Sequence, residues 1–124
     1  MHISIVIPAY NEEHRIGKTL EDYTKLIKKY RNGITILVMV EGTDETTKVV
    51  NRFGRDSKQI RAIYSPVRLG KGGAVVAGIK ELCKNAKPDD IIGFVDADDA
   101  TDADAAEKLI THLKRNRLDG VMGN

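Results

Sequence analysis

The chain has 124 residues, a formal net charge of +2 and 31% charged residues, with both signs interspersed. This length suffices for one domain with a real hydrophobic core and excludes two full domains. The nearly balanced charge predicts a solvated globular surface, so we expect neither nucleic-acid binding nor a disordered tail.

Short apolar runs alternate with amphipathic segments along the whole chain. The predicted strands cover residues 2–8, where Pro8 is expected to end the first one, and residues 34–40, 60–64 and 91–95. The predicted helices run from Glu12 to Tyr30 after a cap at Asn11, from a cap at Thr43 or Asp44 to Gly54, from the glycine-rich segment 69–73 to Cys83, and from a cap at Thr101 to Leu113. A further strand is predicted to begin at Gly120-Val121-Met122.

This alternation predicts an α/β fold. Strands separated by helices of ten or more residues form βαβ units with right-handed crossovers, which give a mainly parallel sheet in a three-layer α/β/α sandwich. Because a new element begins near the last residue, we expect residues 1–124 to be the front portion of a larger domain. An incomplete sheet would leave an apolar edge uncovered, so we also expect self-association into a homo-oligomer.

The remaining global signals argue against several other classes of protein. The sequence has no charged-then-apolar leader and no apolar run near ~18 residues, so we expect a soluble, cytoplasmic chain that only further residues could anchor to a membrane. The single cysteine, Cys83, cannot form an internal disulfide and is predicted to lie in the core. His2, His14 and His112 lack the spacing of a zinc site.

The predicted fourth strand ends in three carboxylates, Asp96, Asp98 and Asp99. Ligands of open α/β sheets bind at this end of the strands. Two acids separated by one residue can give Mg²⁺ or Mn²⁺ one or two oxygen ligands, while substrate phosphates supply others. The alternative is that these residues only favour a turn and a helix start. Because the anions repel one another, a bound cation would explain the cluster.

The segment Gly70-Lys71-Gly72-Gly73 is a second candidate. It does not fit a Walker loop, because Ser65 stands where that motif needs glycine and Gly72 stands where it needs Ser or Thr. It does not fit the dinucleotide fingerprint either, because it follows the third strand. A flexible glycine turn with a cation at a helix start suits either the approach of a diphosphate or merely a tight turn.

The ends of the first two strands supply the third candidate. Tyr10 could pack on a nucleotide base, although Glu12 and its neighbours could simply begin a helix. Glu41 could accept a hydrogen bond from a base or a ribose, although this end of the second strand could instead serve only as a helix cap.

Four segments, taken together and in this order, resemble family 2 glycosyltransferases. They are residues 6–13, 41–46, 69–74 and 95–99. The last two are most similar to the branch of dolichyl-phosphate mannose and glucose synthases. The resemblance covers nearly the whole chain and implies the nucleotide-diphospho-sugar transferase fold called GT-A, of which this chain would be the donor-binding half.

The resemblance also implies roles for individual residues. The nucleotide-sugar site would consist of Pro8, Ala9, Tyr10, Glu12, Glu41, Lys71, Asp96, Ala97 and Asp98. Glu41 would face the base, Lys71 the phosphates and Asp96 the nucleotide or sugar. Asp98, with Asp96, would hold the Mg²⁺ or Mn²⁺ that bridges the diphosphate.

The implied reaction is metal-dependent, inverting transfer from a UDP- or GDP-linked sugar, with a polyprenyl phosphate as the implied acceptor. The segment after the second strand is one residue shorter than usual in the family, and no counterpart of the catalytic base precedes Asn124. We therefore expect donor binding without efficient transfer. The alternatives are a non-catalytic nucleotide-sugar-binding module and a nucleotidyltransferase, which favours a glycine-rich loop where Pro8-Ala9-Tyr10 stands.

Overall fold

The computed structural model describes residues 1–123. It contains one four-stranded sheet in the order β3-β2-β1-β4, and all paired strands are parallel. The strands are β1 (Ile3–Tyr10), β2 (Ile34–Glu41), β3 (Ile60–Tyr64) and β4 (Ile91–Phe94). The helices are α1 (Ile16–Tyr30), α2 (Thr46–Asp56), α3 (Gly70–Cys83) and α4 (Ala103–Arg115), with a short 3₁₀ turn at Arg31–Gly33.

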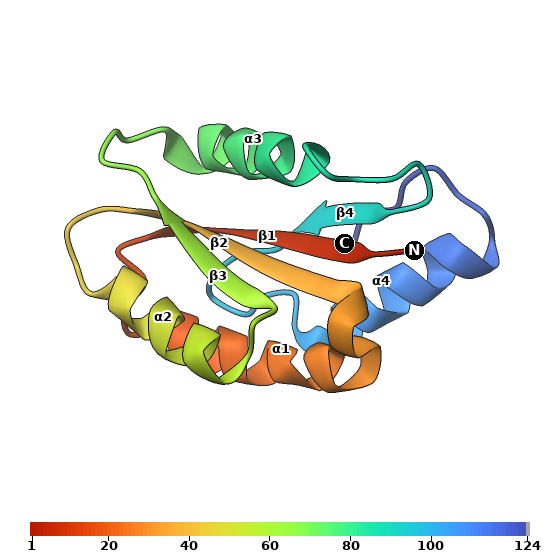
Figure 1. Ribbon diagram of the computed structural model, residues 1–124, viewed down its shortest axis with the longest axis horizontal. Coiled ribbons are helices and arrows are strands. Elements are labelled where there is room, and N and C mark those ends of the chain that lie inside the picture. The colour runs from red at the N-terminus through yellow and green to blue at the C-terminus, as the bar shows by residue number, and fades with distance from the viewer. Residues whose placement is uncertain (124) are drawn as a thin grey trace.

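The elements form three layers. Helices α1, α2 and α4 lie on one side of the sheet and α3 lies alone on the other (Figure 1). The predicted α/β/α sandwich with a parallel sheet is therefore confirmed. Each helix returns the chain to the end of the sheet where the strands begin, so all strands run in the same direction. Their carboxyl ends therefore lie together at the opposite end of the sheet.

The core has one part on each side of the sheet. Alternate residues of β1, including Ile3, Ile5 and Ile7, pack with the buried stripe of α1 and with α4. Val6 points the other way and packs with Leu37, Met39 and the residues of α3. A strand buried on both faces needs an apolar residue at almost every position, which explains the continuous apolar runs of β1 and β2.

Helix α3 approaches the sheet closely because its contact stripe is built from small residues. A Cβ atom added at Gly78 would lie 2.6 Å from Cγ1 of Val6 and 3.0 Å from Cγ of Met39. We expect Gly78→Ala to lower the free energy of unfolding by about 1 to 3 kcal/mol, since a packed core resists an extra methyl group. Urea unfolding measures this effect.

Gly72→Ala is the matched control on the same helix. Apart from its chain neighbours and the backbone of its own helix, no atom of residues 1–123 lies within 4 Å of the Cβ position at Gly72, so alanine should be neutral or favourable there. A loss of stability in Gly78→Ala no larger than that in Gly72→Ala would show that α3 does not lie this close to the sheet.

The prediction that Pro8 ends the first strand is wrong. The carbonyl of Val6 accepts a hydrogen bond from the amide of Val95 at 3.0 Å, so the backbone groups of Val6 face β4. Residues two positions apart in a strand face the same neighbour, so the backbone of Pro8 also faces the β4 side. Pairing with β4 ends at Val6 and Phe94, whereas pairing with β2 continues to Tyr10 and Glu41. Pro8 therefore lies where its missing N–H costs no ladder hydrogen bond.

Two predicted helix caps are also wrong. The side chain of Asn11 accepts from the amide of Thr43 at 2.9 Å instead of capping α1. Asp102, not Thr101, caps α4 by accepting from the amide of Ala105 at 2.8 Å. The first error arises because a cap is a local prediction, whereas Asn11 bonds to a segment far away in the sequence.

Two further predictions fail near the ends of elements. Cys83 is exposed, because α3 turns Ala74 and Gly78 towards the sheet and its last residue lies beyond this stripe. Gly120-Val121-Met122 forms no strand, since within residues 1–123 no neighbouring strand pairs with it.

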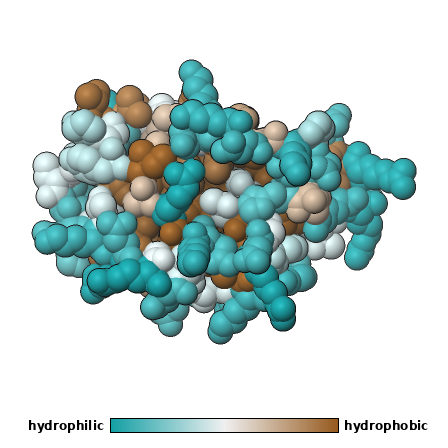
Figure 2. All heavy atoms as spheres, viewed as in Figure 1, coloured by the Kyte–Doolittle hydropathy of each residue, from teal (hydrophilic) through white to brown (hydrophobic). Residues whose placement is uncertain are grey.

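The surface is largely hydrophilic, as the interspersed charges of the sequence predict. Figure 2 shows hydrophilic side chains over most of this face, with hydrophobic atoms at its centre and upper left. Exposed apolar side chains include Val67, in the segment before α3, and Phe94, at the end of the edge strand β4.

Candidate functional site

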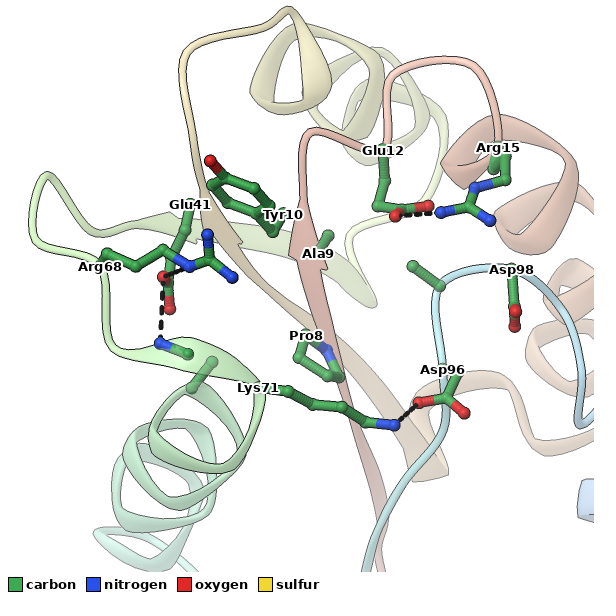
Figure 3. Close-up of a pocket in the computed structure, with 13 residues that line it drawn as sticks. Pro8, Ala9, Tyr10, Glu12, Arg15, Glu41, Arg68, Lys71, Asp96 and Asp98 are labelled. Carbon is green, nitrogen blue, oxygen red and sulfur yellow. Dashed lines mark hydrogen bonds and ion pairs between the residues drawn. The ribbon is translucent and has the colours of Figure 1, made fainter.

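A cavity of about 280 Å³ opens at the carboxyl ends of β1 and β2, beside the start of α3 and the loop after β4 (Figure 3). Every residue of the predicted site lines it: Pro8, Ala9, Tyr10, Glu12, Glu41, Lys71, Asp96, Ala97 and Asp98. The four segments singled out in the sequence thus meet around one space. Their binding roles stay predictions.

The cavity also contains Arg15 and Arg68, which the sequence did not single out, and Gly70 and Ala74, which belong to the predicted glycine-rich segment but were not assigned to the site. Arg15 forms an ion pair with Glu12, at 2.5 Å between Nη2 and Oε1, while the other oxygen of Glu12 is buried without a hydrogen-bond partner among residues 1–123. Arg68 could have been found in the sequence as a basic residue two positions before Gly70. For Arg15, the sequence gives no indication of a role beyond its spacing of three residues from Glu12.

Glu41 is the most buried acid of the site, with 4% of its surface exposed. It is the last residue of β2, and its Oε2 accepts from the amides of Leu69 at 2.9 Å and Gly70 at 3.4 Å. The carboxylate therefore holds the first turn of α3 against the sheet. Its Oε1 is buried and has no hydrogen-bond partner in the described part of the chain.

Arg68 connects Glu41 with Tyr10. The centre of its guanidinium lies 3.5 Å from the centroid of the Tyr10 ring, and its Nε lies 3.5 Å from Oε2 of Glu41. Figure 3 shows the three side chains together on one side of the cavity. They form a wall with an aromatic face, a cation and a buried acceptor.

Lys71 and Asp96 form an ion pair that lines another part of the cavity (Figure 3). The ammonium group of Lys71 reaches from α3 to Oδ1 of Asp96 at 2.5 Å. Since the lysine belongs to the first turn of α3, its charge adds to the positive end of the helix dipole. This part of the cavity can attract a phosphate group.

The loop after β4 separates its carboxylates. Asp98 is exposed and faces the cavity, and its Oδ1 accepts from the amide of Ala100 at 3.0 Å. Asp99 has φ 62° and does not line the cavity. Burial, followed by the charge of Asp22, raises the pKa of Asp99 to about 6.

Three side chains of α1 hold this acidic loop in place. The hydroxyl of Thr19 donates to the carbonyl of Ala97, and that of Tyr23 to the carbonyl of Thr101, both at 2.5 Å. The carboxylate of Asp22 accepts from the amide of Ala103 at 2.7 Å, which lowers the pKa of Asp22. The position of Asp98 thus depends on hydrogen bonds from α1, one layer away from the cavity.

We expect Asp99→Asn to raise the free energy of unfolding by about 1 to 3 kcal/mol near pH 7.5 and to change it little near pH 4. Folding raises the pKa of Asp99 from 3.8 to about 6, so this carboxyl makes the folded state lose stability as the pH rises through that window. Asparagine cannot ionise and tolerates the positive φ.

Urea unfolding at both pH values tests this prediction. Asp104→Asn removes a charge from an exposed position outside the cavity and should give a similar, small change at both. An Asp99→Asn effect that does not depend on pH would contradict the assignment.

The family to which the chain belongs follows from comparison with known proteins. The model of the family described as glycosyl transferase family 2 matches residues 4–124. The chain belongs to glycosyl transferase family 2. The family resemblance seen in the sequence is thereby confirmed.

A relative from this family supports the branch that the sequence indicated. The dolichyl-phosphate beta-glucosyltransferase of Dictyostelium discoideum is 32% identical over 135 residues, which cover 100% of this chain and 40% of the relative. The chain spans between 20% and 40% of the length of several curated relatives that it matches.

Two solved structures of sugar-transferring enzymes share the fold. The mannosyltransferase PcManGT of Pyrobaculum calidifontis, in complex with GDP-Man and Mn²⁺, has a TM-score of 0.67 at 20% identity over 90% of this chain and 32% of its own. Glucosyl-3-phosphoglycerate synthase of Mycobacterium tuberculosis, in complex with Mn²⁺, UDP and phosphoglyceric acid, has a TM-score of 0.59 at 22% identity over 96% of this chain and 39% of its own. The fold is that of GT-A glycosyltransferases.

Of the helices in residues 1–123, none has both the length and the apolar character that crossing a membrane requires.

Proposed function

We propose that the cavity binds the nucleoside diphosphate part of a sugar donor and that this chain is the donor-binding part of a glycosyltransferase. The observation that carries the proposal is that one cavity contains a base-sized aromatic face, a buried acceptor, a lysine at a helix start and two carboxylates. Each is suited to a different part of such a donor. The solved structures with GDP-Man and with UDP support this class of ligand.

In this proposal, Tyr10 packs on the base and Glu41 accepts a hydrogen bond from it. The unpartnered oxygen of Glu12 is available to a ribose hydroxyl, and Lys71 turns from Asp96 to the diphosphate. A phosphate oxygen replaces one carboxylate partner of the lysine, so the ammonium group stays paired.

The acidic loop fits a cation that is bound together with the donor. Within residues 1–123 no group of three or more His, Cys, Asp or Glu side chains could hold a metal ion. Mg²⁺ is commonly bound by one or two carboxylates and by substrate phosphates, so Asp98, with Asp96, is sufficient once a diphosphate is present. A cation bound there would stabilise the charge that develops on the leaving diphosphate. Neighbours in complex with Mn²⁺ support this assignment.

The acceptor and the stereochemistry are proposed from the relatives and from the family resemblance. The dolichyl-phosphate glucosyltransferase relatives support a polyprenyl phosphate acceptor, and the family resemblance supports inversion at the sugar carbon. Among residues 1–123, the acids that line the cavity are Glu12, Glu41, Asp96 and Asp98, all of which are assigned to donor or cation. We therefore propose that residues 1–124 bind donor and transfer sugar poorly.

Calorimetry with UDP- and GDP-linked sugars, with and without Mn²⁺, tests the proposal. We expect binding of at least one nucleotide sugar, strengthened by Mn²⁺, without appreciable release of free sugar. Glucose and mannose without a nucleotide should not bind. If neither nucleotide class binds at millimolar concentration, the proposal is wrong.

A further inference from the structure

A second cavity, of about 490 Å³, lies at the other end of the strands from the candidate donor site. The amino ends of β1 and β2 and the last turn of α3 bound it, in the right half of Figure 1. Among residues 1–123, this amino-end cavity shares no lining residue with the first cavity. Donor binding in the first cavity therefore does not account for its composition.

The face of the sheet that packs on α3 becomes polar at this end. Val6 and Leu37 on this face belong to the apolar core against α3. Two residues earlier on each strand, and so on the same face, Ser4 and Thr35 pair in register and line the amino-end cavity with hydroxyl groups. Ser4 is only 8% exposed. Because a buried hydroxyl costs free energy unless it has a hydrogen-bond partner, this end of the sheet favours a polar occupant.

Two basic side chains of the amino-end cavity have donors to spare. The guanidinium of Arg61 lies 3.9 Å from Oε1 of Glu81, which is too far for a hydrogen bond. Lys87 also lines this cavity, and its ammonium group forms no salt bridge within residues 1–123. Both cations are therefore available to an anionic ligand.

The acids of the amino-end cavity are better satisfied from within the chain. Oδ1 of Asp90 accepts from the amide of His2, and Oδ2 accepts from the amide of Lys87, each at 2.8 Å. Glu81 pairs through Oε2 with Lys84 at 2.7 Å, which leaves its Oε1 as an acceptor. The cavity thus combines two cations and two hydroxyl groups with one carboxylate oxygen that can accept a hydrogen bond.

We infer that the amino-end cavity binds a small phosphate monoester that also carries hydroxyl groups, such as a sugar phosphate. Arg61 and Lys87 bind the phosphate, since a guanidinium holds two phosphate oxygens at once and an ammonium group adds a point charge. The hydroxyl groups of Ser4 and Thr35 donate to further phosphate oxygens. A hydroxyl group of the ligand donates to Oε1 of Glu81. The inference lies outside the proposed donor site and does not depend on it.

Two features favour a phosphate monoester over a carboxylate or a bare anion. Two cations and two hydroxyl groups offer more donors than the two oxygens of a carboxylate can use, whereas a phosphate monoester has three terminal oxygens and a charge near −2. The volume of about 490 Å³ also exceeds what a phosphate ion fills and lies within the range of small-molecule sites.

Backbone-amide NMR of the unaltered chain with glucose 6-phosphate, inorganic phosphate and glucose tests the inference first. We expect saturable shifts of amides around the amino-end cavity, such as those of Ser4, Thr35 and Ala86. Glucose 6-phosphate should bind about fivefold or more tightly than inorganic phosphate, and glucose should cause no shifts there. Lys71→Gln, in the first cavity, should leave these shifts unchanged. Shifts confined to the first cavity, or none that saturate, would overturn the inference.

Arg61→Gln and Lys87→Gln supply the second test, and both replace exposed side chains, so the variants should fold. Each should weaken glucose 6-phosphate by about fivefold or more, since each removes a charged donor. Lys58→Gln is the charge-matched control, because Lys58 is exposed and lines neither cavity, and its affinity should stay within about twofold of the unaltered chain.

Equal weakening in Lys58→Gln and Lys87→Gln would show a general charge effect and overturn the inference. Unchanged affinity in both Arg61→Gln and Lys87→Gln would overturn it as well. Either result leaves the proposed donor site untouched, because calorimetry with nucleotide sugars measures the first cavity.

Discussion

Replacing Asp98 by Asn is expected to remove the Mn²⁺-dependent part of nucleotide-sugar affinity, with a loss of about 10- to 100-fold when Mn²⁺ is present. The carboxylate is exposed at the cavity, and within residues 1–123 its one hydrogen bond is accepted by Oδ1 from the amide of Ala100. The side-chain carbonyl oxygen of asparagine can still accept the hydrogen bond from the backbone amide of Ala100, so the loop should keep its conformation. Asparagine cannot supply the negative charge that a divalent cation requires.

Calorimetry of the variant with and without Mn²⁺ checks this result. In the absence of Mn²⁺, the affinity of the variant should equal or slightly exceed that of the unaltered chain, because a charge that repels the diphosphate has been removed. Asp104→Asn is the charge-matched control outside the cavity and should keep the full effect of Mn²⁺. An Asp98→Asn variant that Mn²⁺ still strengthens as before would exclude Asp98 as the ligand.

Replacing Gly42 by Ala is expected to lower the free energy of unfolding by about 3 kcal/mol or more. Gly42 has φ +106°, and an added Cβ atom would lie 2.2 Å from Oδ1 of Asn11. That oxygen also accepts from the amides of Thr43 and Asp44, so the clash would break the contact between the ends of β1 and β2. Backbone strain and lost hydrogen bonds therefore add.

Thermal unfolding followed by circular dichroism measures the loss, and we expect the midpoint to fall by on the order of 10 °C. Gly33→Ala is the control, because no atom of the described residues other than its chain neighbours lies within 4 Å of its Cβ position. If the unfolding midpoint of Gly42→Ala equals that of Gly33→Ala, the segment after β2 does not have the described conformation. Because Tyr10 and Glu41 flank this contact, a folded Gly42→Ala variant should also bind donor more weakly.

Much of the fold could be predicted because its elements are encoded locally. The runs at Ile3–Ile7 and Ile34–Val40 are apolar at nearly every position, as expected for strands with helices on both faces. The residues at the strand ends could be predicted to converge because parallel strands bring their carboxyl ends together. Tyr10, Glu41 and Asp98 meet at the cavity for this reason.

The details that could not be predicted depend on contacts between distant segments. Asn11 resembles a helix cap locally, but it binds Thr43 in the neighbouring loop. Asp98 and Asp99 are neighbouring acids in the sequence, but Asp98 lines the cavity, whereas Asp99 has a positive φ and interacts with Asp22. Arg68 reaches Tyr10 through a long side chain whose direction no local pattern specifies.

The two helices beside the cavity are anchored to very different degrees. Helix α1 buries Ile16, Thr19, Leu20, Tyr23, Leu26 and Ile27, whereas α3 buries only Ala74, Val75 and Gly78. Local opening is easiest where few apolar contacts resist it, so α3 can shift at lower cost than α1. Lys71 belongs to α3, whereas hydrogen bonds from α1 hold the loop that contains Asp98. The part of the cavity formed by α3 can therefore adjust to donors of different size, while the position of Asp98 stays fixed.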